Sequence, residues 1–332
     1  MSGDTTDDSL TYHVDGDLVP AEEATVFVRD RGFMYGDGAF ETLRIYGGDP
    51  FEWAAHRDRL QRTAETLGFA DAVPADLRDR VDATLAANDF EDAYCKVSVT
   101  RGVQPGKLTP DPDVDPTVVV YVSPLGRGGV EGEPVWDEPA TLQTVRTRRP
   151  PAESLPADAK THNYLPGILA RLELRRAATA EFAADEAVMR TVDGYLAEGA
   201  TSNLFLVDGG TLKTPSEDLP ILPGVTRSVA IELAESEGFS VRTGEYTLDD
   251  LRDADEVFLT NSTWEIRPVT SVDGIDVSVG PMTRLLARLF DERVEREYYG
   301  GVDDGSGGEN TEDEVAGDTD GAPHGDTPGD DA

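Results

Sequence analysis

The chain has 332 residues, of which 38% are hydrophobic, so its length is typical of two domains and its apolar content is sufficient for a packed core. Its 66 acidic residues against 29 basic ones give a net charge of −37, which disfavours nucleic-acid and membrane-surface binding and is typical of a salt-adapted, halophilic surface. The single cysteine excludes internal disulfides and a Cys-based zinc site. No apolar run is long enough for a membrane span, so we expect a cytoplasmic protein.

Polar, acid-rich segments form both ends of the chain, at residues 1–9 and 301–332. They contain too little apolar surface to offset the entropy of ordering, so we expect disordered tails. In the first half, strands are predicted at 10–14, 25–28, 39–46, 94–100 and 117–122. Helices are predicted at 56–67 and 77–88. This alternation predicts an α/β domain over residues 10–123.

A segment rich in Gly and Pro, residues 124–134, is predicted to connect this domain to a second one over 135–300. Strands are predicted there at 140–146, 186–190, 195–197, 203–207, 211–213 and 256–260. The run Asp208-Gly209-Gly210 predicts a hairpin turn. Helices are predicted at 165–177, 226–237 and 282–293.

Lys160 is the residue that most strongly suggests chemistry. The chain uses arginine for nearly all of its 29 basic positions, and its lysines are Lys96, Lys107, Lys160 and Lys213. An amine, unlike a guanidinium, can lose its proton and attack a carbonyl group, so Lys160 before a predicted helix indicates a Schiff-base lysine. The alternative is an ordinary surface lysine. Dinucleotide, P-loop, zinc-protease and serine-nucleophile motifs are absent, and the histidines are scattered, so we expect no metal site.

Three further segments combine polar groups with small residues. Glu198 precedes Gly199 and an apolar strand, which suggests a buried carboxylate where backbone approaches a ligand. Val225 and Thr226 open a predicted helix, whose N–H groups could bind an anion. The hydroxyl residues Ser262 and Thr263 follow an apolar strand. Each segment alone is also compatible with a plain turn or helix cap.

Together and in this order, the segments resemble the fold-type IV (class IV) pyridoxal-phosphate enzymes: branched-chain aminotransferases, D-amino acid aminotransferases and aminodeoxychorismate lyases. The stretch from Asp30 to Arg44 looks like the opening signature of that family, and His56 to Leu60 matches its phosphate-arginine helix. The resemblance covers residues 10–298. It implies an α+β, two-domain fold, with a smaller N-terminal α/β domain and a larger, β-barrel-like C-terminal domain with helices. It also implies pyridoxal 5'-phosphate as cofactor and a homodimer.

The resemblance also implies roles for individual residues. Lys160 would be the Schiff-base lysine and general base, and Glu198 would pair with the pyridine nitrogen and keep it protonated. Tyr164 would lie beside the cofactor oxygen. The phosphate would be held by Arg59, by the N–H groups of Val225 and Thr226, and by the hydroxyl of Thr263 or Ser262.

The reaction depends on the expected substrate wall, which comprises Tyr35, Phe40, Thr42, Tyr94, Lys96, Arg101 and Lys107. Thr42 stands where branched-chain enzymes usually have glycine, and Lys96 stands where many have arginine. The Arg/His pair of D-amino acid aminotransferases is missing after Gly102. We therefore predict a 4-amino-4-deoxychorismate lyase that produces 4-aminobenzoate and pyruvate for folate synthesis. The alternative is a branched-chain-type L-amino acid:2-oxoglutarate aminotransferase; a non-catalytic binding scaffold would be expected to lack Lys160 or Glu198.

Overall fold

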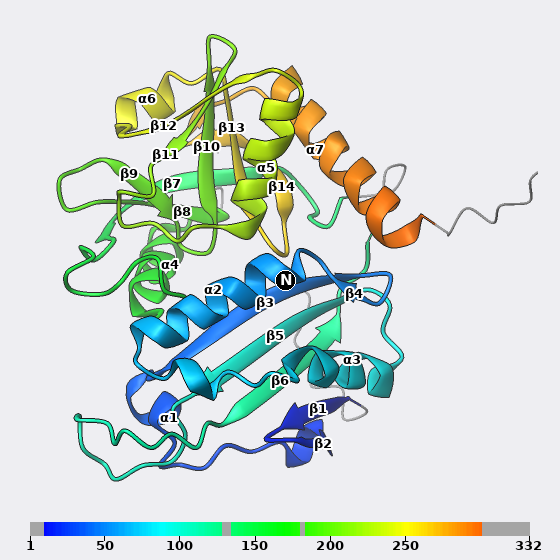
Figure 1. Cartoon of the computed structure of the whole chain (residues 1–332). Helices are drawn as coiled ribbons and strands as arrows, with labels where there is room; N and C mark the ends of the chain where they lie inside the picture. The colour runs from blue at the N-terminus through cyan, green and yellow to red at the C-terminus, as the bar shows by residue number, and fades with distance from the viewer. Residues whose placement is uncertain (1–9, 128–133, 180–182, 301–332) are drawn as a thin grey trace, which may run out of the picture. The chain divides into compact units, whose positions relative to one another are not determined.

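The structure is a computed structural model that describes residues 10–127, 134–179 and 183–300 (Figure 1). The predicted tails, residues 1–9 and 301–332, lie outside the described residues, as does most of the predicted connector. The chain up to Tyr299 clusters as one unit and contains two sheets, one in each half of the sequence.

The first sheet has six strands in the order β2-β1-β6-β5-β3-β4, and all of its neighbours are antiparallel. Its strands are β1 (Thr11–Val14), β2 (Asp17–Pro20), β3 (Gly38–Tyr46), β4 (Asp49–Pro50), β5 (Ala93–Thr100) and β6 (Val118–Pro124). Helices α2 (Trp53–Thr66) and α3 (Leu77–Asn88) pack with it around a core that includes Leu43, Leu60 and Val97. In β5 buried residues alternate with half-buried ones, so Tyr94 and Lys96 lie on the face away from that core.

The strand predicted at 25–28 is wrong. The turn at Asp15 and Gly16 returns the chain at once, so β1 pairs with β2, and no strand is assigned at 25–28. Phe27 and Val28 gave that segment a strand-like composition, yet they are 60% and 68% exposed. A short helix, α1 (Arg31–Tyr35), follows and is capped by Asp30, whose carboxylate accepts the N–H groups of Gly32 and Phe33.

The second sheet has nine strands in the order β12-β11-β10-β13-β14-β7-β8-β9, with β15 paired to β14. Its strands are β7 (Ala140–Arg148), β8 (Glu186–Arg190), β9 (Leu196–Gly199), β10 (Asn203–Asp208), β11 (Thr211–Pro215), β12 (Ser240–Gly244), β13 (Glu256–Asn261), β14 (Glu265–Val272) and β15 (Ile275–Asp276). The edge strand β9 also contacts β10 and β11, so the sheet curls on itself, as expected for a β-barrel-like architecture. The predicted hairpin at Gly209 and Gly210 is confirmed between β10 and β11.

Helices of the second half pack against this sheet at separate places. Helices α5 (Val225–Ser236) and α7 (Pro281–Val294) contact each other and strands β13 and β14, whereas α4 (Leu165–Ala177) contacts β7 and β8. A short helix, α6 (Leu248–Arg252), begins with a capping box formed by Thr247 and Asp250. In the described residues, no helix combines the length and the apolarity that crossing a membrane requires.

The two halves share a core. Tyr46 and Phe51 from the first half belong to the same buried cluster as Phe205, Phe258 and Phe290 from the second. The rings of Phe51 and Phe290 lie 5.2 Å apart, and Phe205 stacks on Phe258 at 4.6 Å. The division into two domains therefore stays a prediction, whereas the α+β fold with one sheet in each half is established.

Candidate active site

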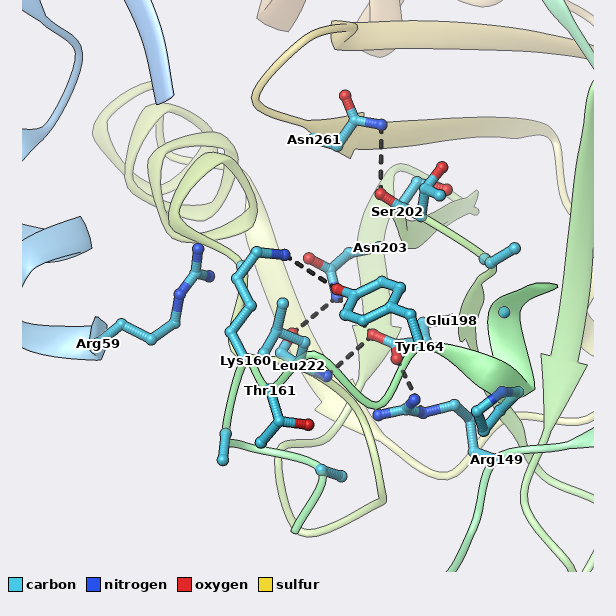
Figure 2. A pocket seen from close by; sticks show the side chains of 18 of the residues that line it. Arg59, Arg149, Lys160, Thr161, Tyr164, Glu198, Ser202, Asn203, Leu222 and Asn261 are labelled. Atoms are coloured by element: carbon cyan, nitrogen blue, oxygen red, sulfur yellow. Dashed lines mark hydrogen bonds and ion pairs between the residues drawn. The ribbon is translucent and has the colours of Figure 1, made fainter. Parts of the chain in front are cut away.

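One pocket gathers side chains from five distant parts of the sequence (Figure 2). It contains about 770 Å³ of empty space, part of it open to solvent. The lining comes from α2, the irregular segment before α4, the loop after β9, the start of α5 and the end of β13, and it includes Arg59, Lys160, Tyr164, Glu198, Asn203, Thr226 and Ser262.

Lys160 lies in the irregular segment that leads to α4. Its Nζ atom donates to the Tyr164 hydroxyl at 3.0 Å and lies 4.6 Å from the centre of the Phe40 ring. The ion pairs of the described residues include none with Lys160. The amine is therefore held by a phenol and a ring rather than neutralised by a carboxylate, which leaves its nitrogen available for chemistry.

Glu198 is the penultimate residue of β9 and is buried in the wall of the pocket, with 7% of its surface exposed. Its carboxylate pairs with Arg149 Nε at 2.9 Å and accepts the N–H of Leu222 at 2.9 Å (Figure 2). Burial raises its pKa, while the charge of Arg149, the Leu222 N–H and the charge of Lys160 act in the opposite direction. A further cation in the pocket beside Glu198 would therefore stabilise the ionised form of its carboxylate.

The start of α5 suits an anion. The helix begins at Val225, and no side chain caps it, so its first N–H groups have no capping side chain as acceptor. Thr226, in the first turn, is buried. The Arg59 guanidinium donates to the carbonyl of Pro223 at 2.7 Å, which places its charge beside this helix end. A glycine is required at Gly224, because a Cβ atom there would lie 1.9 Å from Asn203 Oδ1. A phosphate group fits this corner, because helix end and guanidinium offer donors together.

Arg59 is itself held from behind by Glu41 on β3. The two side chains form a bidentate pair, with Arg59 Nε and Nη2 donating at 2.8 and 2.6 Å, and His56 Nδ1 lies 2.7 Å from the same carboxylate. Burial alone would raise the pKa of Glu41, but the charge and hydrogen bonds of Arg59 and His56 lower it to about 2. Burial lowers the pKa of His56, while its hydrogen bond to Glu41 and the charge of Glu41 act in the opposite direction.

Glu186, which begins β8, holds the loop between Glu198 and Asn203 in place through hydrogen bonds. This fully buried carboxylate accepts the N–H groups of Ala200 and Thr201, at 3.1 and 3.3 Å, and the Thr201 hydroxyl at 2.8 Å. The loop lies close to α4, where a Cβ atom at Gly167 would meet the Ala200 carbonyl at 2.9 Å. The loop backbone that lines the pocket is therefore fixed on two sides.

The hydroxyl cluster after β13 divides into two groups. Ser262 lines the pocket, together with Thr260, whose buried hydroxyl has no hydrogen-bond partner. Thr263 is not among the lining residues, because its hydroxyl donates to Asn261 Oδ1 at 3.2 Å and closes the turn. Of the two hydroxyls expected at the phosphate, the structure brings only Ser262 to the pocket.

The residues expected at the substrate wall are only partly brought together. Phe40 lies between two amines, since Lys96 Nζ is 4.5 Å and Lys160 Nζ is 4.6 Å from its ring centre. Thr42 pairs with Lys96 across β3 and β5, and its side chain hydrogen-bonds Tyr94. His162, which we did not predict, lies 5.8 Å from the Phe40 ring, and burial and then the charge of Lys96 lower its pKa to about 4.

None of the seven expected substrate-wall residues is among those that line the pocket. Phe40 adjoins it through its contact with Lys160, whereas Arg101, Lys107 and Tyr35 make other contacts. Arg101 is buried and ion-paired with Asp37, with a further hydrogen bond to the Leu67 carbonyl, so its donors serve the loop after β5. The Lys107 carbonyl accepts from Arg31, whose guanidinium also lies over the Tyr35 ring. These contacts hold the three residues near the start of β3 and the end of β5.

Sequence reasoning missed several supporting residues of the site, namely Glu41, Arg149, Glu186 and Asn203. Asn203 donates to the Leu222 carbonyl at 2.9 Å and contacts Glu198 at 3.4 Å. Arg149 carries no local signal, because it stands in a run of arginines before Pro150. Glu41 could have been found, since an acid within a buried strand must pair with a cation, and Arg59 was already a candidate.

Several known proteins are similar to this chain in sequence. The family model described as amino-transferase class IV matches residues 38–272. A Methanocaldococcus jannaschii protein, provisionally named a branched-chain-amino-acid aminotransferase, is 36% identical over 85% of this chain and 95% of its own length. The D-alanine aminotransferase of Listeria monocytogenes is 34% identical, with 85% and 96% covered. The aminodeoxychorismate lyase of Bacillus subtilis is 32% identical, with 86% and 96% covered.

Solved structures of similar proteins also resemble this chain. The branched-chain aminotransferase of the thermophilic archaeon Thermoproteus uzoniensis, solved with norvaline, superposes with a TM-score of 0.77 at 29% identity, covering 87% of this chain and 97% of that one. A Legionella pneumophila protein, provisionally identified as 4-amino-4-deoxychorismate lyase, superposes with a TM-score of 0.72 at 26% identity, covering 81% and 95%. The proteins that resemble this chain in sequence or in structure are therefore named for more than one reaction.

Proposed function

The chain belongs to the amino-transferase class IV family, whose cofactor is pyridoxal 5'-phosphate, and from that premise we propose that it is a cytoplasmic 4-amino-4-deoxychorismate lyase. The products would be 4-aminobenzoate and pyruvate, and the pathway folate synthesis. Family membership leaves the substrate open, because one scaffold supports several reactions. The choice therefore depends on the substrate side of the pocket.

The pocket fits the cofactor at each of its functional groups. The aldehyde would bond to Lys160 Nζ, the phosphate would lie between Arg59 and the start of α5, and the ring nitrogen would face Glu198. When bound, the cofactor supplies a carbonyl for covalent attachment of the substrate amine and a ring that accepts an electron pair. Glu198 would hold a proton at the ring nitrogen, since its buried charge favours a cation beside it.

Lys160 would carry the proton of the reaction. Its amine removes the proton from the substrate carbon that bears the amino group, within reach of the Tyr164 hydroxyl, which holds the nitrogen in place. The carbon–oxygen bond to the enolpyruvyl group then breaks as the substrate ring becomes aromatic. The enolpyruvyl group leaves as an enolate, which takes the proton from the Lys160 ammonium and becomes pyruvate.

The observation that carries the choice of lyase is the amine of Lys96 beside the Phe40 ring. Burial and then the charge of Lys160 lower its pKa, and no ion pair within the described ranges neutralises it. A partly buried amine disfavours a branched aliphatic side chain and favours a carboxylate. Aminodeoxychorismate carries two carboxylates, so one could meet Lys96. The hydroxyls of Thr42 and Tyr94 make the same wall polar.

The alternative is a branched-chain-type L-amino acid:2-oxoglutarate aminotransferase. It is favoured by the 36% identity to the Methanocaldococcus jannaschii protein. It shares every contact to the cofactor, and 2-oxoglutarate also has a second carboxylate. The two functions therefore differ in the substrate that is consumed rather than in the residues that would hold the cofactor.

One assay separates them. Purified protein with pyridoxal 5'-phosphate should convert aminodeoxychorismate to 4-aminobenzoate and pyruvate, and should form little glutamate from leucine and 2-oxoglutarate. Lys160→Ala should abolish product formation, and Lys96→Met should raise KM about tenfold. Lys213→Met, at an exposed pair with Asp208, should leave both product formation and KM unchanged. Glutamate without 4-aminobenzoate would establish the aminotransferase instead.

We also propose that the enzyme is a homodimer. Large apolar side chains are exposed on neighbouring elements, with Phe33 at 74%, Leu108 at 80% and Leu165 at 61%. These elements are adjacent, because Arg31 of α1 donates to the Leu108 carbonyl, and Asn163 donates to the Gly36 carbonyl. Light scattering should give twice the chain mass, and Phe33→Lys with Leu108→Lys should give the monomer. A monomeric wild type would refute the proposal.

A further inference from the structure

The backbone of Lys160 is bound to α2 through one hydroxyl group. The Lys160 N–H donates to Thr63 Oγ1 at 3.0 Å, and the same hydroxyl donates to the carbonyl of Arg59 at 2.9 Å. Thr63 is 1% exposed and lies one helical turn after Arg59. One hydroxyl therefore joins the backbones of the two residues that would hold opposite ends of the cofactor.

Such a connection matters because Lys160 has little regular structure around it. Its segment pairs with β3 through an isolated bridge between Ala39 and Thr161, in which the Phe40 N–H donates to the Lys160 carbonyl at 3.0 Å and the His162 N–H donates to the Gly38 carbonyl at 2.9 Å. The Phe40 bond fixes the carbonyl side of Lys160, and the Thr63 bond fixes the amide side. Without the second bond, the peptide before Lys160 could rotate, and the long side chain would amplify the movement at Nζ.

The chemistry of the hydroxyl group fits this double role. A hydroxyl has one proton to donate and lone pairs to accept, so it can bind the Arg59 carbonyl and the Lys160 N–H at once. Donation to the carbonyl four residues earlier is a common arrangement for threonine in helices, and by itself it indicates nothing. The additional N–H from a segment 97 residues away is what makes Thr63 unusual.

We propose that the Thr63 hydroxyl is a positioning group that sets the separation between the Lys160 amine and the Arg59 guanidinium. This inference rests on the proposed function, because it takes Lys160 and Arg59 as the two attachment points of pyridoxal phosphate. It assigns Thr63 no contact with the cofactor. It predicts that Thr63 affects how fast and how tightly the cofactor is captured, whichever reaction follows.

The test compares Thr63→Val, which keeps the shape but loses the hydroxyl, with Thr63→Ser, which keeps it. Thr84→Val is the matched control, because Thr84 is also fully buried in a helix and donates to the carbonyl four residues earlier, at Arg80. Apoprotein would be titrated with pyridoxal 5'-phosphate, and absorbance would give the dissociation constant and the rate of covalent capture. Borohydride reduction and peptide mass spectrometry would locate the bond.

Thr63→Val should raise the dissociation constant and slow covalent capture about tenfold each, the size expected for one lost hydrogen bond. Thr63→Ser and Thr84→Val should stay within twofold of wild type in both. Wild-type values for Thr63→Val would overturn the inference, and so would a Thr63→Ser variant as impaired as Thr63→Val. If Thr63→Val does not fold, Thr63→Ala replaces it, and equal behaviour of Ala and Ser would overturn the inference.

Lys160→Ala separates this inference from the proposed function. It should bind the cofactor without a covalent bond. If Lys160→Ala still showed a pyridoxyl group fixed by borohydride at the site, the proposed role of Lys160 would fail, whatever Thr63 does. If capture depends on Lys160 but not on the Thr63 hydroxyl, only the positioning role fails.

Discussion

The ion pair behind Arg59 makes a quantitative prediction about acid stability. Replacing Glu41 by glutamine removes the charge and keeps the shape of a buried side chain. The pKa of Glu41 is about 2 in the folded protein against an ordinary 4.5, a difference of about 2.5 units. At about 1.36 kcal/mol per unit, the ionised carboxylate contributes about 3 kcal/mol to folding. This agrees with the ~3–5 kcal/mol typical of breaking a buried pair.

The sign follows from the lowered pKa. The contribution is complete above the ordinary pKa of 4.5 and is lost as the pH falls toward 2, where the folded carboxyl also takes up a proton. About 1.4 kcal/mol should remain at pH 3 by the same relation. The difference in free energy of unfolding between wild type and Glu41→Gln should therefore shrink by about half between pH 7 and pH 3.

Urea denaturation of the apoproteins over that pH range measures this difference directly. Glu65→Gln, at an exposed acid on α2, the helix that carries Arg59, is the control and should differ little from wild type. A loss of stability in Glu41→Gln that is the same at pH 3 and pH 7 would refute the reasoning, because it would show that the shape of the side chain matters and its charge does not.

Three further predictions concern the pocket and the surface. Arg149→Met removes a charge that lowers the pKa of Glu198, so that pKa should rise further; the apoprotein should then lose stability more steeply than wild type as the pH rises above 4.5, and parallel pH profiles would contradict this. Gly167→Ala should weaken cofactor binding several-fold, because its Cβ would lie 2.9 Å from the Ala200 carbonyl and displace the loop; an unchanged dissociation constant in a cofactor titration would contradict it. Raising KCl from about 0.1 to about 2 M should raise the melting temperature, because salt screens repulsion within a chain of charge −37, and a lower melting temperature would count against the salt-adapted surface.

Local patterns predicted the regular elements well. The helices Leu77–Asn88 and Leu165–Ala177 and the strand Glu186–Arg190 have the predicted bounds. Three strands of the second sheet, β12, β14 and the two-residue β15, escaped prediction, and the first two did so for physical reasons. β14 lies between β13 and β7 but contains Arg267 and Pro268, which weaken a strand signal. β12 is an exposed edge strand, whose polar residues need no apolar alternation.

The candidate site was predictable where the residue type itself signals chemistry. Lys160, Glu198 and the start of α5 were candidates because an amine, a carboxylate near glycine and helix N–H groups can each serve a ligand, and their order along the chain resembles that of the class IV enzymes. Arg149 and Glu186 were not, since their partners are distant in the sequence and only the fold brings them together. Thr263 shows the opposite error, because a turn used the hydroxyl that the sequence offered to a ligand.

The core that Tyr46 and Phe51 share with Phe205 and Phe290 limits how this enzyme could be recombined with its relatives. A chimera joined near residue 124 would combine two aromatic side chains from one ancestor with the complementary half of their packing from another. Such hybrids should fold poorly unless α7 is exchanged together with the first half. The first half, which carries the expected substrate-wall residues, and the second half, which carries most of the proposed cofactor-binding residues, would thus be inherited as one piece. We therefore expect new specificities to arise by point substitution around Phe40 more readily than by exchange of the halves.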